Sequence, residues 1–521
     1  MADKLAVDFG NSNTVLSVWN SEKAEPQILS IPEYSAAENA LIPSLIHYEN
    51  DGRRLIGDQI LRMGLEAAPG TFKWMKRYIN LRSPYTMLVG GRRIQAKQAA
   101  EDFLNAVFMA AKADADIDLS EITMSVPLES FEYYENWLLT QAELSGFDRI
   151  RLVDEAAAAA AGYGAEVHPG DVLLILDFGG STFQAEEVLI LEKAQEEGRY
   201  GRVLAKSESS LGGSVIDRWL MEDFLERNSL SSLYPGVLQN SRRLLEDCER
   251  LKIHLSDCGT DRIRFDAGVG NFYETEYSRG MLNEVLEKHR FFENIHSVAE
   301  QTVLSAADQG FPENKITHVI PVGGGSQIPA LLDQIKRDFG MERVLTGEPM
   351  GAAARGAACI AGGLDLYDFI QHRYAVRYRD RSSGEYSYQT IVESGTHYPT
   401  KEAAAVFTVR AVYDNQERMG LAVYESSPFT DPLESEKTEI IFDKDGRVHL
   451  LAAEEPGRNR KMFWLNERNT AFLKTGRKVI KGEKCFRVSF EIGPDKMLLM
   501  SAEDLYSGNQ VYNQLPVIRL N

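Results

Sequence analysis

Two short segments of the sequence place an acidic residue at the end of an apolar run, directly before glycine and small polar residues. One follows Leu5–Val7 and reads Asp8-Phe-Gly-Asn-Ser-Asn13, and the other reads Asp177-Phe-Gly-Gly-Ser-Thr182. Glycine lets backbone N–H groups approach phosphate oxygens, and polar side chains add further donors. Each carboxylate can hold water molecules on a bound Mg²⁺. The pattern therefore predicts two phosphate-binding loops at a magnesium-dependent site.

The two segments lie about 170 residues apart, which predicts two similar half-domains that face each other. A third turn, Gly323-Gly-Gly-Ser-Gln327, follows the apolar run 319–322 and contains no acid. This turn better suits the nucleoside end of a ligand. Each turn alone is usually an ordinary connection between a strand and a helix, but the three together, in this order, predict a nucleotide site. Phosphoryl transfer requires little beyond such positioning and charge neutralisation.

The elements that must carry these turns follow an α/β pattern. Strand-like runs at 5–7, 44–48, 122–126 and 172–176 alternate with helical patterns, of which 96–111 is one. The region 214–310 is expected to be mainly helical, with 246–255 and 282–304 as its clearest helices, and 317–322 is expected to be a strand. From Tyr374 to Leu520, short alternating segments predict a separate β domain. The segment 364–370 alternates apolar and acidic residues, so we expect it to dock rather than to act as a simple spacer.

Composition excludes several classes of function. The net charge of −20 would repel a polyanion, so nucleic acid is not an expected partner. No apolar run approaches the ~20 residues that span a bilayer, and the N-terminus carries no hydrophobic signal segment. We therefore expect a soluble, cytoplasmic protein with no membrane partner. The four cysteines form no metal-binding or disulfide-like spacing, which favours buried, reduced thiols.

The three turns resemble the phosphate and adenosine motifs of the actin, sugar-kinase and heat-shock ATPase superfamily. Further segments resemble the DnaK-type, seventy-kilodalton heat-shock chaperones: Arg54-Leu-Ile-Gly-Asp58, Lys76-Arg77, Val126-Pro127, Val153-Asp-Glu155 with the alanines that follow, Leu211-Gly-Gly213 and Cys248-Glu-Arg-Leu-Lys-Ile-His-Leu-Ser256. The resemblance covers residues 5 to about 362. It implies an α/β actin-like (ribonuclease-H-like), duplicated ATPase domain over 1–362, an interdomain linker over 363–372 and a β-sandwich peptide-binding domain over 373–521.

The resemblance also implies the ligands ATP, ADP and Mg²⁺ and a set of site residues. Asp8 and Asp177 would hold Mg²⁺ through water, while Lys76 and Glu155 would orient the attacking water; Lys73 competes with Lys76 for this function. The implied nucleotide-binding residues are Gly10, Asn11, Ser12, Asn13, Gly179, Gly180, Ser181, Thr182, Gly212, Gly213, Glu249, Lys252, Ile253, Ser256, Gly323, Gly324, Gly325, Ser326 and Gln327.

Several residues depart from the family pattern. Asn11-Ser12 replaces a pair of threonines, Gln184 replaces a carboxylate of the second loop, and Met350 replaces an acid after Pro349. Ile253 and Gln327 replace arginines that commonly sandwich adenine. These departures keep nucleotide binding plausible but put the rate of hydrolysis in question. Glu135 stands where the family has an arginine that senses the linker, so stimulation by a J-domain co-chaperone is expected to be weak.

The C-terminal region resembles the peptide-binding β-sandwich of the same chaperones, on segments that include Tyr398-Pro-Thr-Lys401 and Asp414-Asn-Gln416. On this resemblance Val376, Phe407, Met419 and Leu421 would line an apolar groove for an extended peptide. Each is also a plausible ordinary core residue. The last part of the sequence resembles the final hairpin of that domain, and no helical lid follows it, so we expect a lidless variant with fast peptide exchange.

The favoured function is an ATP-dependent molecular chaperone that binds extended, unfolded polypeptide segments. A J-domain co-chaperone and a nucleotide-exchange factor are its candidate partners. Two alternatives remain open. One is an ATP-binding scaffold that does not hydrolyse, which Gln184 and Met350 make reasonable. The other is a small-molecule kinase of the same superfamily, against which the match at Lys76 and Glu155 and the added β domain argue.

Overall fold

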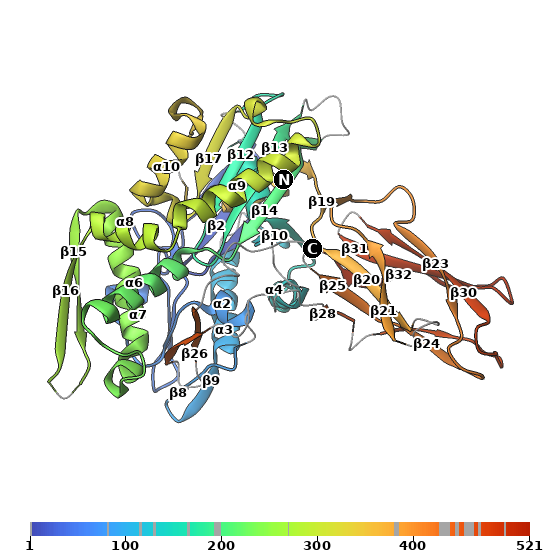
Figure 1. The fold of residues 1–521 in the computed structure, drawn as a ribbon, viewed down its shortest axis with the longest axis horizontal. Helices are drawn as coiled ribbons and strands as arrows, with labels where there is room; N and C mark the ends of the chain where they lie inside the picture. The colour runs from blue at the N-terminus through green and yellow to red at the C-terminus, as the bar shows by residue number, and fades with distance from the viewer. Residues whose placement is uncertain are drawn as a thin grey trace. The chain divides into compact units, whose positions relative to one another are not determined.

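The computed structural model describes residues 3–80, 83–113, 117–128, 132–163, 167–191, 199–268, 270–347, 349–379, 385–426, 438–442, 447–452, 463–466, 470–493 and 496–520. The chain divides into two compact units (Figure 1). The first contains Met1–Leu128, Tyr133–Leu366 and Asp431–Pro456, and the second contains Glu129–Glu132, Tyr367–Thr430 and Gly457–Asn521.

Two sheets of the first unit repeat one arrangement. The first has the order β11 (Arg149–Asp154), β10 (Ile117–Val126), β1 (Asp3–Phe9), β2 (Asn13–Asn20), β3 (Glu25–Leu29), with β4 (Ile42–Pro43) beside β2. The second has the order β17 (His318–Val322), β12 (Val172–Phe178), β13 (Phe183–Ile190), β14 (Arg199–Ser209), β18 (Asp365–Tyr367). In each, a central strand has a parallel neighbour on one side and two successive antiparallel strands on the other. The duplication expected from the two phosphate loops is thus present in the sheets.

Helices α5 (Glu155–Gly162) and α11 (Ala352–Ala361) lie between these two sheets, α11 against β1, β2 and β10 and α5 against β12 and β13. Their alanines and glycines allow an unusually close approach. A Cβ added to Gly356 would lie 1.5 Å from the Ala158 carbonyl oxygen, and one added to Gly162 would lie 2.7 Å from that of Ala352. The run of alanines after Glu155 contains no polar residues that would mark a solvent-facing side of the helix. Accordingly, Ala156 to Ala161 are all buried.

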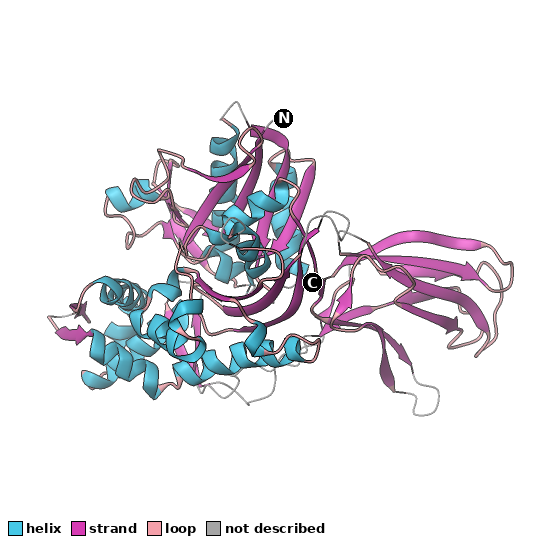
Figure 2. Ribbon diagram, turned by 90° about the horizontal axis from the view of Figure 1, so that it is seen from above, coloured by secondary structure: helices cyan, strands magenta, loops and turns pink. Residues whose placement is uncertain are grey.

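Some of the remaining helices of the first unit cover the sheets, while α6 (Gly213–Arg227), α7 (Pro235–Asp257) and α8 (Arg279–Lys288) group together beside a separate hairpin (Figure 1 and Figure 2). Helix α9 (Phe291–Ala307) packs on β13 and β14, and the predicted helix 96–111 is confirmed as α3 (Ala96–Lys112), with Phe103, Leu104, Val107 and Phe108 fully buried. The others are α1 (Asp58–Arg62), α2 (Met75–Asn80), α4 (Glu132–Leu144) and α10 (Pro329–Phe339). Small sheets join β6 (Arg54–Ile56), β5 (Ile46–Tyr48) and β7 (Thr71–Phe72), and β8 (Thr86–Val89) with β9 (Arg92–Gln95).

The region 214–310 is mainly helical, as expected, but one expectation within it was wrong. The single helix over 282–304 is broken between α8 and α9, where Arg290 adopts the left-handed conformation with φ 53°. The indole of Trp219 stacks on His289 with ring centroids 4.5 Å apart, so a tertiary contact holds this turn. The same region also contains a hairpin of β15 (Thr260–Asp266) and β16 (Phe272–Ser278), in addition to its helices.

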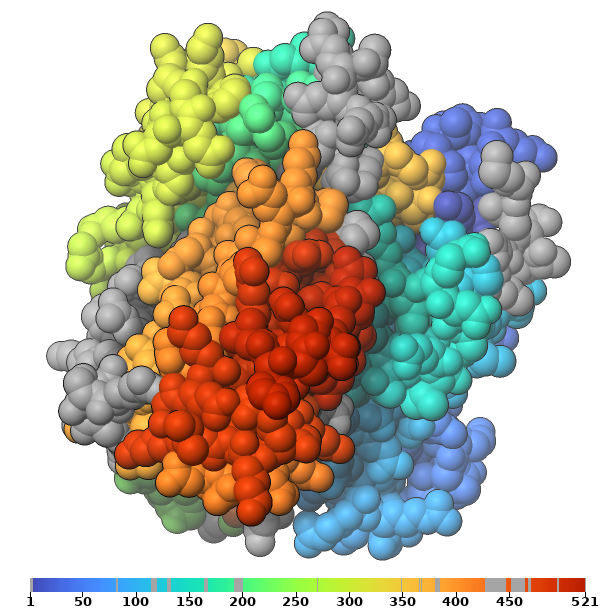
Figure 3. Space-filling model, turned by 90° about the vertical axis from the view of Figure 1, so that its right-hand side faces the viewer, coloured from blue at the N-terminus to red at the C-terminus, as the bar shows by residue number. Residues whose placement is uncertain are grey.

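From Tyr367 onward the described residues form strands and loops only (Figure 2). One sheet has the order β21 (Tyr386–Val392), β20 (Arg373–Arg379), β25 (Val423–Ser426), β28 (Phe463–Trp464), and another has β23 (Ala405–Arg410), β30 (Lys484–Ile492), β31 (Met497–Asp504), β32 (Gln510–Arg519). Shorter pairs join β19 (Phe369–Ile370) to β22 (Thr396–His397) and β24 (Arg418–Leu421) to β29 (Ala471–Lys474). Most of the atoms coloured orange to red in the space-filling view of Figure 3 come from this antiparallel region.

One part of the C-terminal sequence folds with the first unit. Strands β26 (Thr438–Phe442) and β27 (Val448–Ala452) form a hairpin that lies beside α7 (Figure 1). The backbone N–H of Val448 donates to Ser241 Oγ at 2.9 Å, and the Val448 side chain, 2 % exposed, belongs to the hydrophobic core of that unit. We refer to β26 and β27 as the inserted hairpin.

The segment expected to dock does so. Its strand β18 is the edge strand of the second sheet, next to β14. The Leu366 side chain is buried, and its Cδ2 occupies the space that a Cβ on Gly201 would enter, 2.8 Å away. Docking is therefore confirmed for the first part of the segment, whereas Phe369–Ile370 pairs with β22 in the second unit.

Candidate nucleotide site

The two predicted phosphate loops meet at the ends of the two central strands. A Cβ placed on Gly180 would lie 3.3 Å from Asn11 Cβ and 3.5 Å from Ser12 Oγ, so the loops face each other at van der Waals distance. Each is anchored locally: Ser44 Oγ donates to the Gly10 carbonyl at 2.9 Å, and the Gly213 N–H donates to the Gly179 carbonyl at 3.0 Å. Glycine-rich loops of this kind can present backbone N–H groups to an oxyanion.

Four charged residues predicted from the resemblance lie together at these loops. Lys76 Nζ, on α2, donates to Glu155 Oε1, at the start of α5, at 2.6 Å, and the side chains are only 6 % and 13 % exposed. Asp8 Oδ1 accepts from Ser125 Oγ at 2.7 Å. The carboxylates of Glu155, Asp8 and Asp177 interact electrostatically with one another and with Lys76. The structure therefore brings the catalytic candidates into one cluster.

The electrostatics of the cluster favour a cation. Burial and the neighbouring Glu155 raise the pKa of Asp8 to about 6, although Lys76 and the Ser125 hydroxyl oppose the shift. Burial, Glu155 and Asp8 raise the pKa of Asp177 well above its usual range. Three carboxylates with one ammonium group carry excess negative charge, which a divalent ion would neutralise.

Asp8 and Asp177 are the two carboxylates predicted to hold magnesium through water, and they come from the central strands of the two sheets, β1 and β12. Among the described residues, no group of three or more His, Cys, Asp or Glu side chains is arranged to hold a metal ion. Magnesium binding at Asp8 and Asp177 stays a prediction.

Lys76 remains charged at any ordinary pH. Burial lowers the pKa of its ammonium group, but Glu155, the Tyr134 phenol and Asp8 outweigh burial, and the pKa lies above the usual range. Lys76 can therefore donate hydrogen bonds but cannot accept a proton from water.

Helix α7 contributes a second group of charged side chains. Glu249 accepts hydrogen bonds from Ser12 Oγ at 3.3 Å and from Lys73 Nζ at 2.7 Å. Lys252 Nζ lies 2.7 Å from Asp217 Oδ1 and donates to the Gly213 carbonyl at 2.9 Å. Glu249 and Lys252 are thus not solvated surface charges, because both are paired at the loops.

The remaining α7 residues are less engaged. Ser256 Oγ donates to the Lys252 carbonyl of its own helix at 3.2 Å, and the Ile253 side chain is 53 % exposed. An exposed isoleucine offers a base an apolar surface but no charge. Adenine contact by these two residues stays a prediction.

The predicted adenosine motif forms a short 3₁₀ turn, Gly324–Gln327, after β17. Gly323 has φ 78°, and a Cβ on it would lie 2.5 Å from Asp177 Oδ1, so only glycine fits between this turn and the second loop. Ser326 Oγ donates to the Gly323 carbonyl at 2.7 Å, while Gln327 is exposed. A Cβ on Gly324 would lie 3.4 Å from the Met350 sulfur, so Met350 borders this turn.

Two polar atoms of the second phosphate loop lack hydrogen-bond partners among the described residues. They are Ser181 Oγ and Gln184 Oε1, both buried. Gln184 lies opposite Asp177 in the antiparallel pair of β12 and β13, and its Nε2 donates to Glu155 Oε2 at 3.4 Å. Buried polar groups without partners are costly, so these atoms are suited to contact a bound ligand. This observation supports the fit of a nucleotide phosphate with its hydrated metal ion.

The predicted peptide-groove residues lie in the core of the second unit. Val376, Met419 and Leu421 are buried and Phe407 is half-buried, all within one hydrophobic cluster. The Phe407 ring lies 5.8 Å from that of Phe490. Their contact with peptide is untested and stays a prediction.

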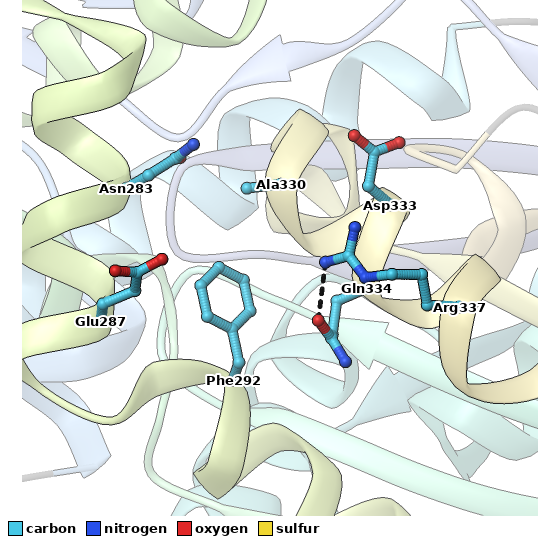
Figure 4. A pocket seen from close by; sticks show the side chains of 7 residues that line it. All are labelled: Asn283, Glu287, Phe292, Ala330, Asp333, Gln334 and Arg337. Carbon is cyan, nitrogen blue, oxygen red and sulfur yellow. Dashed lines mark hydrogen bonds between the residues drawn. The ribbon is translucent and has the colours of Figure 1, made fainter.

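A separate pocket of about 210 Å³ lies among α8, α9 and α10 (Figure 4). Its polar lining includes Glu287, Asp333 and an Arg337 guanidinium that donates to Gln334 Oε1 at 2.7 Å. None of the predicted site residues lines it.

Of the four cysteines, Cys258 is exposed, contrary to expectation, and the other three are buried.

Sequence reasoning missed several participants. Lys73 does not compete with Lys76 but pairs with Glu249. Asp217, the partner of Lys252, lies one helical turn after Gly213, and this spacing is a signal that identifies it. Tyr134, in the first turn of α4, places its ring centroid 5.8 Å from Lys76 Nζ. No sequence pattern points to Tyr134.

Comparisons with known proteins agree with this geometry. The family model described as Hsp70 protein matches residues 4–432. The chain is 27 % identical over 394 residues to the chaperone protein DnaK of Deinococcus proteolyticus, and the match covers 70 % of this chain and 59 % of that protein. It is 26 % identical over 395 residues to a chaperone protein DnaK of Thermus thermophilus, covering 70 % and 61 %. The chain thus spans about three fifths of the length of these relatives. No helix of the described residues is both long and apolar enough to span a bilayer.

The family model covers most of the nucleotide unit, all three turns and the linker strand β18. The duplicated sheets, the facing glycine loops and the lysine–carboxylate cluster lie within it. The chain belongs to the Hsp70 protein family.

Proposed function

We propose that this protein binds ATP with Mg²⁺, hydrolyses it slowly, and uses the nucleotide state to change its affinity for extended polypeptide segments. The observation that carries the proposal is the Lys76–Glu155 ion pair, 2.6 Å long, beside two carboxylates and two facing glycine loops. Members of the Hsp70 family are ATPases, and the site supplies the positioning and charge that phosphoryl transfer requires.

In this proposal the loop backbones hold the phosphates and the ionised groups serve the chemical step. Asp8 and Asp177 hold water molecules of the metal ion. Glu155 accepts a hydrogen bond from the attacking water, while the permanently charged Lys76 donates to it and to the transferred phosphoryl group. Glu249 and Lys252, fixed by Lys73 and Asp217, bind the nucleoside side.

Coupling to the second unit runs through β18. An added edge strand gains backbone hydrogen bonds, and the buried Leu366 contributes ~1–3 kcal/mol of hydrophobic free energy. A segment transmits a signal only if its docking free energy differs between nucleotide states. In this proposal, β18 docks on β14 in one nucleotide state and not in the other, so its docking free energy differs between the two states.

The second unit is proposed to bind an extended peptide through backbone hydrogen bonds and apolar pockets near Met419. A J-domain co-chaperone and a nucleotide-exchange factor are proposed as partners. Glu135, 3 % exposed, occupies the position of the family's linker-sensing arginine. Because a buried carboxylate reverses the charge there, J-domain stimulation is expected to be weak.

An ATP-binding scaffold without hydrolysis is the second candidate. Gln184 favours it, since an amide stands opposite Asp177 in place of a carboxylate. Single-turnover hydrolysis with purified full-length protein separates the candidates. Release of phosphate from preloaded ATP supports the ATPase, and retention of intact ATP supports the scaffold. Formation of ADP only when a small-molecule acceptor is added, with the phosphoryl group on the acceptor and no free phosphate, supports a kinase.

A further inference from the structure

Tyr134 is a buried residue of the lysine–carboxylate cluster that none of the predicted motifs contains. It lies in the first turn of α4, which follows β10, the strand that runs parallel to β1. Its side chain is 1 % exposed, and the ring centroid lies 5.8 Å from Lys76 Nζ. The ring also packs against Trp137 at a centroid distance of 5.9 Å, which fixes its position.

The Tyr134 hydroxyl has no hydrogen-bond partner among the described residues, although it is buried. A buried phenol normally finds a partner, because leaving its hydroxyl unpaired costs free energy. Ser181 Oγ, in the second phosphate loop, and Gln184 Oε1, on the side chain that donates to Glu155, are buried and unpaired as well. The Tyr134 ring lies close to Lys76, and the phenol interacts electrostatically with Lys76, Glu155 and Asp8.

We infer that the Tyr134 hydroxyl is a hydrogen-bond partner of the water that attacks ATP, acting beside Lys76 and Glu155. This inference rests on the proposed ATPase function. In the reaction the water oxygen forms a bond to the γ-phosphorus, the bond from that phosphorus to the bridging oxygen breaks, and ADP leaves with the electron pair. The proton lost by the water passes to the phosphate product.

The hydroxyl remains neutral during this step. Burial raises the pKa of Tyr134 above its usual range, although Lys76 opposes the shift. A neutral phenol can both donate and accept a hydrogen bond. It therefore orients a water molecule without adding a fourth negative charge next to Asp8, Asp177 and Glu155.

Tyr134→Phe tests the inference because it retains the ring and its packing on Trp137 and removes only the oxygen. We expect the single-turnover hydrolysis rate to fall about tenfold, the effect of one hydrogen bond made in the transition state. The dissociation constants for ATP and ADP should remain within about twofold, because the loop backbones bind the phosphates. Tyr133→Phe is the matched control, as it removes the neighbouring hydroxyl, and it should leave the rate unchanged.

A double-mutant cycle with Lys76→Ala supplies a readout that a structural effect would not change. If both side chains act on one water molecule, the fold-reduction in hydrolysis rate of the double variant should be smaller than the product of the two single fold-reductions.

Two results would overturn the inference and leave the proposed function standing. One is a Tyr134→Phe variant that hydrolyses ATP at the wild-type rate, and the other is a Tyr133→Phe variant that loses as much activity as Tyr134→Phe. Absence of hydrolysis in the wild-type protein, with ATP bound, would overturn both.

Discussion

Lys73 and Lys76 are three residues apart, but they pair with carboxylates on different sides of the nucleotide site. Lys73 Nζ lies 2.7 Å from Glu249 Oε2 on α7, whereas Lys76 Nζ lies 2.6 Å from Glu155 Oε1 on α5. The first pair fixes a predicted nucleoside-binding helix, and the second belongs to the predicted hydrolysis cluster. The two lysines should therefore affect different kinetic constants.

Lys76→Ala should lower the single-turnover hydrolysis rate by orders of magnitude with a modest change in ATP affinity, since loop backbones supply most phosphate contacts. Lys73→Ala should instead weaken ATP binding, by about tenfold, because Glu249 loses its buried partner. Stopped-flow binding with a fluorescent ATP analogue and phosphate release measure the two effects. Equal turnover in Lys76→Ala and the wild type would remove Lys76 from the mechanism.

The linker strand gives a prediction for coupling. Leu366→Asp places a carboxylate in the buried position beside Gly201, so β18 should detach from β14 while both units stay folded. ATP should then no longer change the affinity for a labelled, leucine-rich peptide, as measured by fluorescence anisotropy. Leu233→Asp, at a side chain 69 % exposed, is the control and should retain the ATP effect.

Phe369→Asp, three residues further along, should behave differently from Leu366→Asp. Phe369 is buried in the second unit, where β19 pairs with β22. Its replacement should therefore destabilise that unit instead of only uncoupling it. If ATP still shifts peptide binding in a folded Leu366→Asp protein, the coupling runs through another segment.

Because the inserted hairpin packs in the core of the first unit, Val448 should affect the stability of that unit although it is distant in sequence from the nucleotide motifs. Val448→Asp should destabilise the first unit by about 2–4 kcal/mol, the cost of losing a buried valine and introducing a charge. The melting transition that ADP raises, which reports on the nucleotide unit, should move to a lower temperature. Val412→Asp, at a side chain 41 % exposed in the second unit, should leave that transition unchanged. A Val448→Asp protein with the wild-type melting profile would show that the hairpin contributes no stability.

Glu187 on β13 predicts a pH dependence of stability. Its carboxyl is fully buried, has no partner among the described residues, and burial raises its pKa from 4.5 to about 8. Between these two values the unfolded chain ionises while the folded chain keeps its proton. The free energy of unfolding therefore loses a contribution as pH rises from 4.5 to about 8, on the order of 5 kcal/mol.

Glu187→Gln removes this titration and retains the shape of the side chain. The variant should be more stable than the wild type at a pH just above 8 and similar to it near pH 4.5, as measured by urea unfolding at several pH values. The same difference in stability at every pH would contradict a raised pKa at Glu187.

The phosphate loops and central strands could be predicted from sequence because an apolar run, an acid and glycines are adjacent in the chain. The break between α8 and α9 has only a weak signal, the basic residues Lys288, His289 and Arg290 where α8 ends, and no glycine or proline. The turn also depends on Trp219, which is far away in sequence. By contrast, β15 and β16 were detectable: buried Ile263 and Phe265 alternate with polar residues before a glycine-containing turn.

Within the site, the resemblance placed the loops correctly and favoured Lys76 over Lys73 as the residue that acts with Glu155. It did not predict that Lys73 pairs with Glu249, because that contact depends on where α7 brings Glu249, which is a tertiary property. The place of Tyr134 near Lys76 is a tertiary property as well, since it depends on how α4 packs beside α2.

The inserted hairpin also bears on the order in which the protein folds during synthesis. The ribosome releases the chain from its N-terminus, and domains generally fold as soon as their sequence is complete. The nucleotide unit receives Val448 only after the linker and the first strands of the second unit have been made. Until then, Ser241 and the neighbouring apolar surface of α7 are uncovered. The two units cannot mature strictly one after the other, and a nascent chain stalled before residue 448 exposes a site for chaperones that bind unfinished proteins.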